Sequence, residues 1–191
     1  MCLTEIRGNK ITIRETVIED AMIMQGWWSD GKIMALEGYP DGFKENVSDV
    51  KKVIKNKSIS RGLFLIMSKS GEPIGECSFD RKTKGACFVS LKICDYKFIH
   101  KGYGTDALYA FVNYLFQTYQ LDKIKTRVLV DHEWAQQLFL KTGFFVVYVD
   151  KNCWTDPTGK IRSFVELEIV KERFEHFYRN YKKVIEVSIN E

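Results

Sequence analysis

Several features that would place this chain in a broad functional class are missing from its 191 residues. The five cysteines (Cys2, Cys77, Cys87, Cys94 and Cys153) are odd in number, widely spaced and without a C-x-x-C pair. That pattern offers neither a disulfide framework nor a zinc site. The net charge of +4 is too small an excess to indicate nucleic-acid binding by itself. We therefore expect a reducing, cytoplasmic setting with no bound metal and no nucleic-acid partner.

Long apolar runs are also missing. Charged side chains are spread through the first 20 residues, so we expect no signal peptide. The longest uncharged run of the longest helical pattern, Ala107 to Leu121, is amphipathic and too short to span a bilayer. The sequence contains no internal repeat, no low-complexity segment and no Gly/Ser linker. We expect no membrane partner, a single domain over residues 1–170, and a helical extension of the same domain over residues 171–191.

What the sequence does contain is an ordered series of strand and helix patterns. Apolar alternation predicts strands at 10–15, 62–68, 73–80, 86–95, 123–130, 144–150 and 161–170. Helical spacing predicts helices at 16–28, 46–57, 102–119 and 132–142, and from 171 onward. One apolar face of the helix at 102–119 consists of Leu108, Phe111, Val112, Leu115 and Tyr119, and Gly143 closes the helix at 132–142. Short turns between the three strands from 62 to 95 imply an antiparallel meander. The crossover through 102–119 implies a parallel pair. The predicted fold class is mixed α+β.

Three shorter segments carry local expectations. The stretch "TVIE", Thr16 to Glu19, reads as a capping box at the start of the first helix. The glycine and proline residues of the segment 36–43 predict a loop. The final helix is aromatic on one side and charged on the other, so its aromatic side must dock on the body of the chain or on a second copy. A homodimer therefore stays open; the aromatic residues are Phe174, Phe177, Tyr178 and Tyr181.

The glycine turn Gly102-Tyr103-Gly104 lies between a strand and the longest helix. Glycines at such a turn let the backbone approach a ligand, and the free N–H groups of the first helical turn favour phosphate. A Walker loop is excluded because Gly104 is not followed by Lys-Ser/Thr. A Rossmann fingerprint does match Gly102, Gly104 and Ala107. The preceding meander and the placement of the nearby acidic residues make that class unlikely.

Two motifs point instead to coenzyme A. The segment "IHKGYG", 99–104, resembles the Q/R-x-x-G-x-G/A signature of the GNAT N-acetyltransferases. The later "HEWAQQLFLKTGF", 132–144, resembles the second conserved segment of that family. The ending "TGKIRSFVELEI" resembles the branch of ribosomal-protein N-terminal and spermidine acetyltransferases. The resemblance covers residues 10–170. It implies a central, mostly antiparallel sheet with a parallel, splayed strand pair, flanked by helices.

The resemblance also implies an activity: acetyl-CoA-dependent transfer of an acetyl group to a primary amine. Backbone groups of Lys92, Ile93 and Cys94 would pair with pantetheine, and one of their N–H groups would stabilise the oxyanion. The amides of 100–105 would hold the pyrophosphate. The implied cofactor-binding set is Lys92, Ile93, Cys94, Ile99, His100, Lys101, Gly102, Tyr103, Gly104, Thr105, His132 and Phe139.

The chain departs from the family pattern at three of these positions. Ile99 replaces Gln or Arg. His132 replaces Asn and is the candidate general base, although a surface residue at a helix start fits the sequence equally well. Phe139 replaces the tyrosine that protonates the leaving thiolate, which should slow the enzyme. The carboxylates of Glu76, Asp80 and Asp95 are further candidate bases.

The sequence indicates the acceptor amine less clearly than the cofactor. The segment between the first two helices carries Glu37, Asp41, Glu45 and Asp49, together with Tyr39 and Phe43 and with Trp27 and Trp28 just before it. An acidic, aromatic pocket would suit a polyamine, another small cationic amine or a protein N-terminus. A polar loop without a binding role is the simpler alternative. The alternative function for the whole chain is that of a catalytically impaired module of the same fold that binds and senses acyl-CoA.

Overall fold

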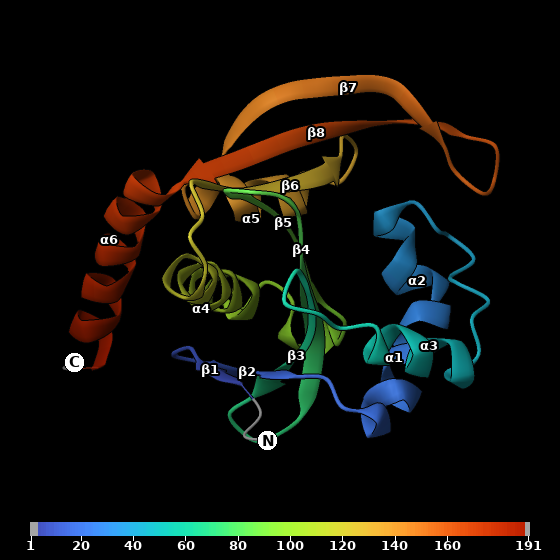
Figure 1. Ribbon diagram of the computed structural model, residues 1–191, viewed down its shortest axis with the longest axis horizontal. Coiled ribbons are helices and arrows are strands. Elements are labelled where there is room, and N and C mark those ends of the chain that lie inside the picture. The colour runs from blue at the N-terminus through green and yellow to red at the C-terminus, as the bar shows by residue number, and fades with distance from the viewer. Residues whose placement is uncertain (1–3, 190–191) are drawn as a thin grey trace.

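A computed structural model describes the backbone of residues 4–189 and the side chains of residues 4–183; Cys2 lies outside them. Eight strands form one sheet in the order β1-β2-β3-β4-β5-β6-β8-β7 (Figure 1). Their bounds are β1 (Glu5–Arg7), β2 (Ile11–Glu15), β3 (Arg61–Ser68), β4 (Pro73–Thr83), β5 (Ala86–Ile93), β6 (Lys123–Leu129), β7 (Phe145–Thr155) and β8 (Ile161–Val170). The helices are α1 (Ala21–Ser29), α2 (Gly31–Met34), α3 (Val47–Lys55), α4 (Tyr103–Thr118), α5 (Glu133–Lys141) and α6 (Lys171–Ile189). Short 3-10 turns are η1 (Ile18–Asp20), η2 (Ala35–Glu37) and η3 (Tyr96–Phe98).

The strand directions confirm the predicted mixed α+β class. β3, β4 and β5 form the antiparallel meander, and β5 pairs with β6 in parallel through the α4 crossover. Every other neighbouring pair of the described sheet is antiparallel. A Rossmann fold requires several consecutive parallel strands, whereas the sheet described in residues 4–189 has one parallel pair.

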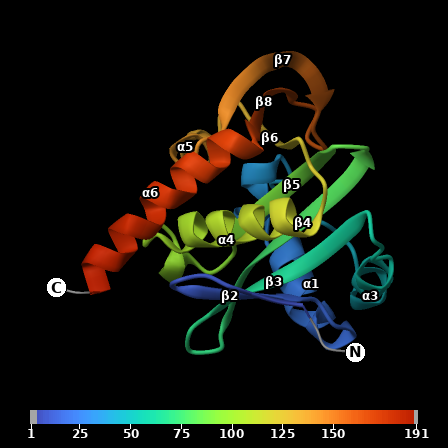
Figure 2. The same cartoon turned by 60° about the vertical axis from the view of Figure 1, so that its left-hand side comes forward.

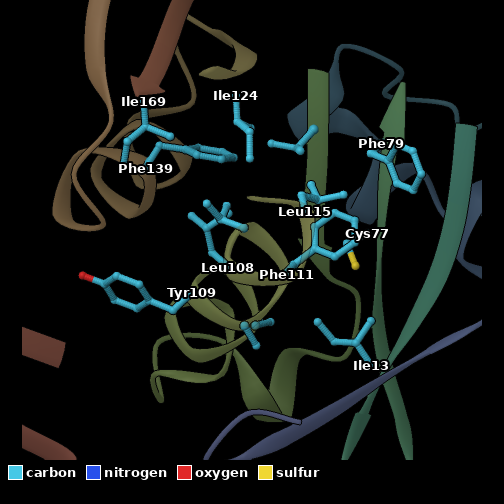
Figure 3. Packing of buried hydrophobic residues seen from close by; sticks show 14 of the residues in the cluster. Ile13, Cys77, Phe79, Leu108, Tyr109, Phe111, Leu115, Ile124, Phe139 and Ile169 are labelled. Atoms are coloured by element: carbon cyan, nitrogen blue, oxygen red, sulfur yellow. The ribbon is translucent and has the colours of Figure 1, made fainter. Parts of the chain in front are cut away.

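Two layers of helices cover the sheet on opposite sides. α1 and α3 lie on one side of β3 and β4, and α4 lies on the other (Figure 1). Side chains of β3 alternate between the two layers. Leu65 packs with α1 and α3, whereas Phe64 and Ile66 join the large core around α4. Figure 3 shows that core, in which Phe111 and Leu115 of α4 approach the sheet.

α4 is buried on more than the predicted face. Of the predicted face, Leu108, Phe111, Val112 and Leu115 are buried, and Tyr119, just after the helix, is partly buried. Tyr109 and Phe116 are buried as well. α6, which lies beside α4 in Figure 2, causes this extra burial. Tyr181 stacks on Tyr109 at 4.2 Å between ring centroids, and Phe174 packs against Phe116. The aromatic side of the final helix therefore docks on its own chain.

Gly143 follows α5 in the chain and is contacted by α6. Its φ of +101° is in the left-handed region that ends helices, as the sequence predicted. A Cβ at this position would lie 2.8 Å from the Phe177 ring, and the Gly143 carbonyl accepts a hydrogen bond from Arg173 Nε at 2.6 Å. Glycine is needed here both for the backbone conformation and for the close approach of α6.

The start of the first helix differs from the prediction. Thr16 does not form a capping box with Glu19; its hydroxyl donates to the Leu63 carbonyl instead. The capping carboxylate is that of Asp20, which accepts the Val17 N–H at 2.7 Å and pairs with Arg14. The chain then makes one 3-10 turn before α1 begins. The prediction was wrong because the Thr16 hydroxyl is bonded to the distant Leu63, and because Asp20, held by its ion pair with Arg14, is the acid that caps.

The remaining differences concern the bounds of elements. Strand β1 was missed, β4 and β7 run longer than predicted, and β5 ends two residues earlier at Ile93. The predicted loop at 36–43 begins inside the short helical segment formed by α2 and η2. None of the helices described in residues 4–189 has the length and apolar character needed to cross a membrane.

Asp106 joins three distant parts of the fold at the first turn of α4. Its buried carboxylate accepts the backbone N–H groups of Asn9, Lys10 and Ile11 in the β1–β2 turn, at 2.9, 2.6 and 3.2 Å. It also accepts the Tyr181 hydroxyl of α6 at 2.7 Å. The residue therefore fixes the helix start between the N-terminal hairpin and the final helix.

We expect Asp106→Ala to lower the free energy of unfolding by about 3 kcal/mol or more, because three backbone N–H groups, that of Ile11 fully buried, and the Tyr181 hydroxyl lose their acceptor. Tyr181→Phe is the matched control; it removes one hydrogen bond and should cost about 1 kcal/mol. Urea denaturation of the two variants measures both values. Equal losses in the two variants would contradict the role given to the backbone contacts.

Candidate active site

A cleft of about 740 Å³ opens where β5 and β6 separate. The two strands pair only over residues 86–88 and 123–125. Beyond these residues the cleft is lined by Ser90–Cys94, in and just after β5, and by Thr126–Leu129 of β6. The start of α4, one side of α5 and residues of α2 and η2 complete the lining. The carboxyl ends of a parallel pair thus form two of the walls.

The hydrogen-bond ladder decides which backbone groups of β5 face the cleft. Cys94 N–H donates to the Ile74 carbonyl of β4 at 2.8 Å, so this predicted oxyanion donor is already used. Backbone groups of an antiparallel strand alternate between its two neighbours. Ile93, opposite Gly75, therefore directs its N–H and carbonyl away from β4 and toward β6. Of the three predicted residues, Ile93 is the one that offers a backbone donor to the cleft.

The loop before α4 has the geometry of an anion site. His100 and Gly102 adopt positive φ values of 58° and 83°. Such a backbone turns successive N–H groups to one side. Within the described chain, no side chain caps α4, and the first bond of the helix runs from Asp106 N–H to the Gly102 carbonyl. The N–H groups at this helix start are thus available to a phosphate.

Gly104 keeps the adjoining part of the cleft open. A Cβ at this position would meet Leu138 at 3.5 Å and Ile93 at 3.7 Å, which are ordinary contact distances. A side chain at Gly104 would therefore fit the fold and narrow the cleft. Gly102 is different, because its φ of +83° strains any other residue there.

Ten of the twelve residues that the sequence indicated line this one cleft: Lys92, Ile93, Cys94, Ile99, His100, Gly102, Gly104, Thr105, His132 and Phe139. The side chains of Lys101 and Tyr103 do not. Tyr103 packs edge-on against Phe98 at 4.9 Å, and Lys101 contributes its carbonyl to the Lys10 ammonium. The side chains of these two members of the loop thus contact the surrounding structure, and the other ten residues share one cleft as candidates for cofactor binding.

His132 begins α5 and faces the cleft. Its side chain is half-buried and makes no capping hydrogen bond. Burial lowers the pKa of the imidazole, and the nearby carboxylates of Glu37 and Asp131 only partly offset this effect. A lowered pKa keeps the ring neutral at pH 7, when it can accept a proton.

Phe139 cannot replace the missing acid. Its ring is buried and packs edge-on against Phe144 at 5.0 Å between centroids. The ring contributes an apolar wall to the cleft. It supplies no proton donor.

A largely buried ion network lies at the wall of the cleft, and sequence reasoning found only part of it. Lys92 Nζ lies 3.1 Å from Glu76 and 3.1 Å from Glu37, while Trp28 donates its indole N–H to Glu76 at 3.0 Å. Burial lowers the pKa of Lys92, but the two carboxylates outweigh burial and leave it raised. Burial raises the pKa of Glu76 against the opposing effect of Lys92. Only the period-two pattern, which placed Glu76 and Lys92 on strands, hinted at the pair.

The other candidate bases are engaged elsewhere. Asp80 pairs with Arg61 and lies opposite Phe88, at the end of β5 where the strands are still together. Asp95 caps η3 by accepting the Lys97 N–H. Neither residue lines the cleft.

The predicted acidic segment does not act as one cluster. Of its four carboxylates, only Glu37 reaches the cleft. Asp49 lies in the first turn of α3 and pairs with Lys52. The aromatic residues of the segment do lie together. The ring centroid of Tyr39 is 4.4 Å from that of Phe43 and 5.4 Å from that of Trp154 of β7. A smaller hollow of about 270 Å³ beside Tyr39 and Trp154 shares Glu37 with the main cleft.

The comparisons with known proteins decide the family. A family model described as the acetyltransferase (GNAT) domain matches residues 10–145, well over half of the chain. The chain belongs to the GNAT acetyltransferase family. Members of this family are N-acetyltransferases that use acetyl-CoA, so the cleft is its candidate active site. None of the curated proteins that were compared matches this chain.

Solved GNAT structures share the fold. Spermidine N-acetyltransferase from Vibrio cholerae, in complex with CoA and spermine, matches with a TM-score of 0.78 at 15% identity, covering 86% of this chain and 98% of that one. A GNAT-family acetyltransferase from Bacillus anthracis has a TM-score of 0.76 at 18% identity, with coverage of 88% and 99%. A ribosomal-protein alpha-N-acetyltransferase, RimL, has a TM-score of 0.76 at 11% identity, with coverage of 89% and 96%.

We expect Lys92→Met to cost about 3 kcal/mol or more of stability, because it leaves two carboxylates near one another without their buried cation. The double variant Lys92→Met with Glu76→Gln removes both charges and keeps an acceptor for Trp28. It should be more stable than the single variant. Urea denaturation at pH 7 measures the stability of Lys92→Met, of Glu76→Gln and of the double variant. A loss of stability in the double variant equal to the sum of the two single losses would show that the ion pair itself does not matter.

Proposed function

We propose that this GNAT enzyme transfers the acetyl group of acetyl-CoA directly to a primary amine, either a small cationic amine such as a polyamine or a protein N-terminus. The observation that carries the proposal is the single cleft. It brings together the free amides before α4, the unpaired edge of β5 and the half-buried His132. The buried thiols of Cys77, Cys87 and Cys94, which are free, suit a reducing cytoplasmic setting.

The residues of the cleft fit coenzyme A part by part. The amides of 100–105 suit the pyrophosphate because they begin a helix without a side-chain cap. The backbone of Ile93, which faces the gap left by β6, suits the amide-containing pantetheine arm. When bound, acetyl-CoA supplies the acetyl group as a thioester.

We assign the chemical roles to two residues. Ile93 N–H donates a hydrogen bond to the acyl oxygen as negative charge develops on it. His132 accepts the proton that the attacking amine must lose, because its lowered pKa keeps the imidazole neutral. The thiolate leaves without an acid, since Phe139 has no proton to give and a thiol has a pKa of about 8.5.

The acceptor side favours a cation. Glu37 lines both the main cleft and the smaller hollow beside Tyr39 and Trp154. Aromatic faces next to a carboxylate attract an ammonium group. Two similar proteins are a spermidine N-acetyltransferase and a ribosomal L7/L12 alpha-N-protein acetyltransferase, and their acceptors agree with this preference.

The first test is calorimetric titration of the purified protein with acetyl-CoA, CoA and NAD, followed by turnover assays on amines. We expect binding of acetyl-CoA and CoA without NAD, and faster acetylation of spermidine or N-terminal peptides than of acidic amines. Gly104→Ala is the matched variant. It should fold normally and weaken CoA binding by about tenfold or more, because its methyl group overpacks the cleft.

Three outcomes would change this conclusion. Absence of CoA binding by a folded protein would overturn the proposed site. CoA binding without turnover of any amine would favour a sensing module, an alternative that the apolar Phe139 supports. Faster turnover of acidic amines would contradict the proposed acceptor class.

Two substitutions test the role of His132. His132→Ala should lower kcat about 10²- to 10⁴-fold if the imidazole is the base. His132→Asn restores the residue usual in the family. It should not recover the rate, because an amide cannot accept the proton. Full recovery in the Asn variant would show that His132 acts through hydrogen bonding alone.

The pH dependence of the rate is a second test of the role of His132. Burial lowers the pKa of His132 below about 6.5, so the base is neutral above that value and is lost by protonation as the pH falls through it. The profile of log kcat/KM in the wild type should therefore steepen on the acid side. Both variants should lack that change of slope. An identical acid side in wild type and variants would remove His132 from the proton path.

A further inference from the structure

Trp134 is unlike the other tryptophans of the chain. Its indole is 69% exposed, although it lines the cleft from the first turn of α5. Trp28 is hydrogen-bonded to Glu76, Trp27 packs between α1 and α3, and Trp154 packs on Phe164. A large exposed aromatic ring at the mouth of a cleft indicates a binding role more often than an isolated surface residue does.

The contact that Trp134 makes fixes where it lies in the site. Its ring centroid is 4.4 Å from that of His100, with the two planes tilted by 53°. His100 belongs to the loop with free amides and holds a φ of 58°, which is uncommon for a residue other than glycine. Such backbone strain collects at functional sites. The indole therefore stands directly beside the proposed pyrophosphate position.

From this geometry we infer that Trp134, assisted by His100, is a stacking platform for the adenine ring of coenzyme A. The inference rests on the proposed use of the cleft by CoA. Adenosine is joined to the pyrophosphate, so a pyrophosphate on the loop amides brings the purine to this end of the cleft. The contact with His100 leaves most of the indole surface accessible to a second ring.

The contribution of the platform to binding can be measured separately from that of the rest of the site. Base–aromatic stacking depends on the purine and is indifferent to the acyl group and the pantetheine arm. Within residues 4–183, the aromatic contact of Trp134 is with His100 and not with His132, to which we give a chemical role. It is therefore a residue for cofactor affinity, and its loss should spare compounds that lack adenine.

The experiment is titration of wild type, Trp134→Ala and Trp134→Phe with three ligands: CoA, 4′-phosphopantetheine and 3′,5′-ADP. The last two are the halves of CoA without and with the purine. In Trp134→Ala we expect binding of CoA and 3′,5′-ADP to weaken by about tenfold, the size of one lost base stack. Binding of 4′-phosphopantetheine should be unchanged, and Trp134→Phe should retain most of the affinity.

Glu133→Ala is the matched control, because Glu133 is exposed in the same helical turn and lies outside the cleft lining. It should bind all three ligands as the wild type does. Indole fluorescence gives an independent readout: CoA and 3′,5′-ADP should quench the wild type, and Trp134→Phe should lose that part of the quenching.

The outcomes are distinguishable. Equal weakening of CoA and 4′-phosphopantetheine in Trp134→Ala, or no weakening of either, would overturn the platform while leaving the cofactor site in place. If the folded wild type binds neither CoA nor its two halves, the proposed function fails and the platform fails with it. Weakening by Glu133→Ala to the same degree would show that the start of α5, and not the indole, carries the effect.

Discussion

The separation of β5 from β6 is the constraint on which the rest of the site depends. The two strands are held together by only three residue pairs and then diverge. Backbone N–H and carbonyl groups that lose a strand partner must find water or a ligand. The sheet therefore keeps an unsatisfied edge inside the protein, next to the helix start that the crossover places at the same end. An extended ligand that carries amides at one end and phosphates at the other satisfies both.

The charges near this opening serve stability more than chemistry. Lys92 was expected from the family pattern to contribute its backbone, yet its side chain turns away to join the carboxylates of Glu76 and Glu37. The pair ties η2 to the sheet and so positions the wall of the acceptor side. A carboxylate held in this way is a poorer candidate for the base than the unpaired imidazole of His132, although both have shifted pKa values.

The sequence could predict whatever depends on local pattern. The meander, the crossover helix, the glycine turn and the closing Gly143 follow from residues that lie next to one another in the chain, and all four agree with the structure. Features that join distant residues could not be predicted. Asp106 accepts amides 95 to 97 positions away, and the bond from Trp28 to Glu76 spans 48. The capping error at Thr16 has the same origin, because the Thr16 hydroxyl donates to the Leu63 carbonyl, 47 positions away.

The position of Asp106 has a consequence for the cohesion of the molecule. One carboxylate joins the hairpin at the beginning of the described chain, the helix start that forms the phosphate loop, and the helix near its end. These three parts must then open together or remain closed together, as a single cooperative unit. A ligand that binds the loop stabilises that unit as a whole. Amide protons of the distant hairpin and of α6 would exchange more slowly in its presence, although neither segment touches the cleft.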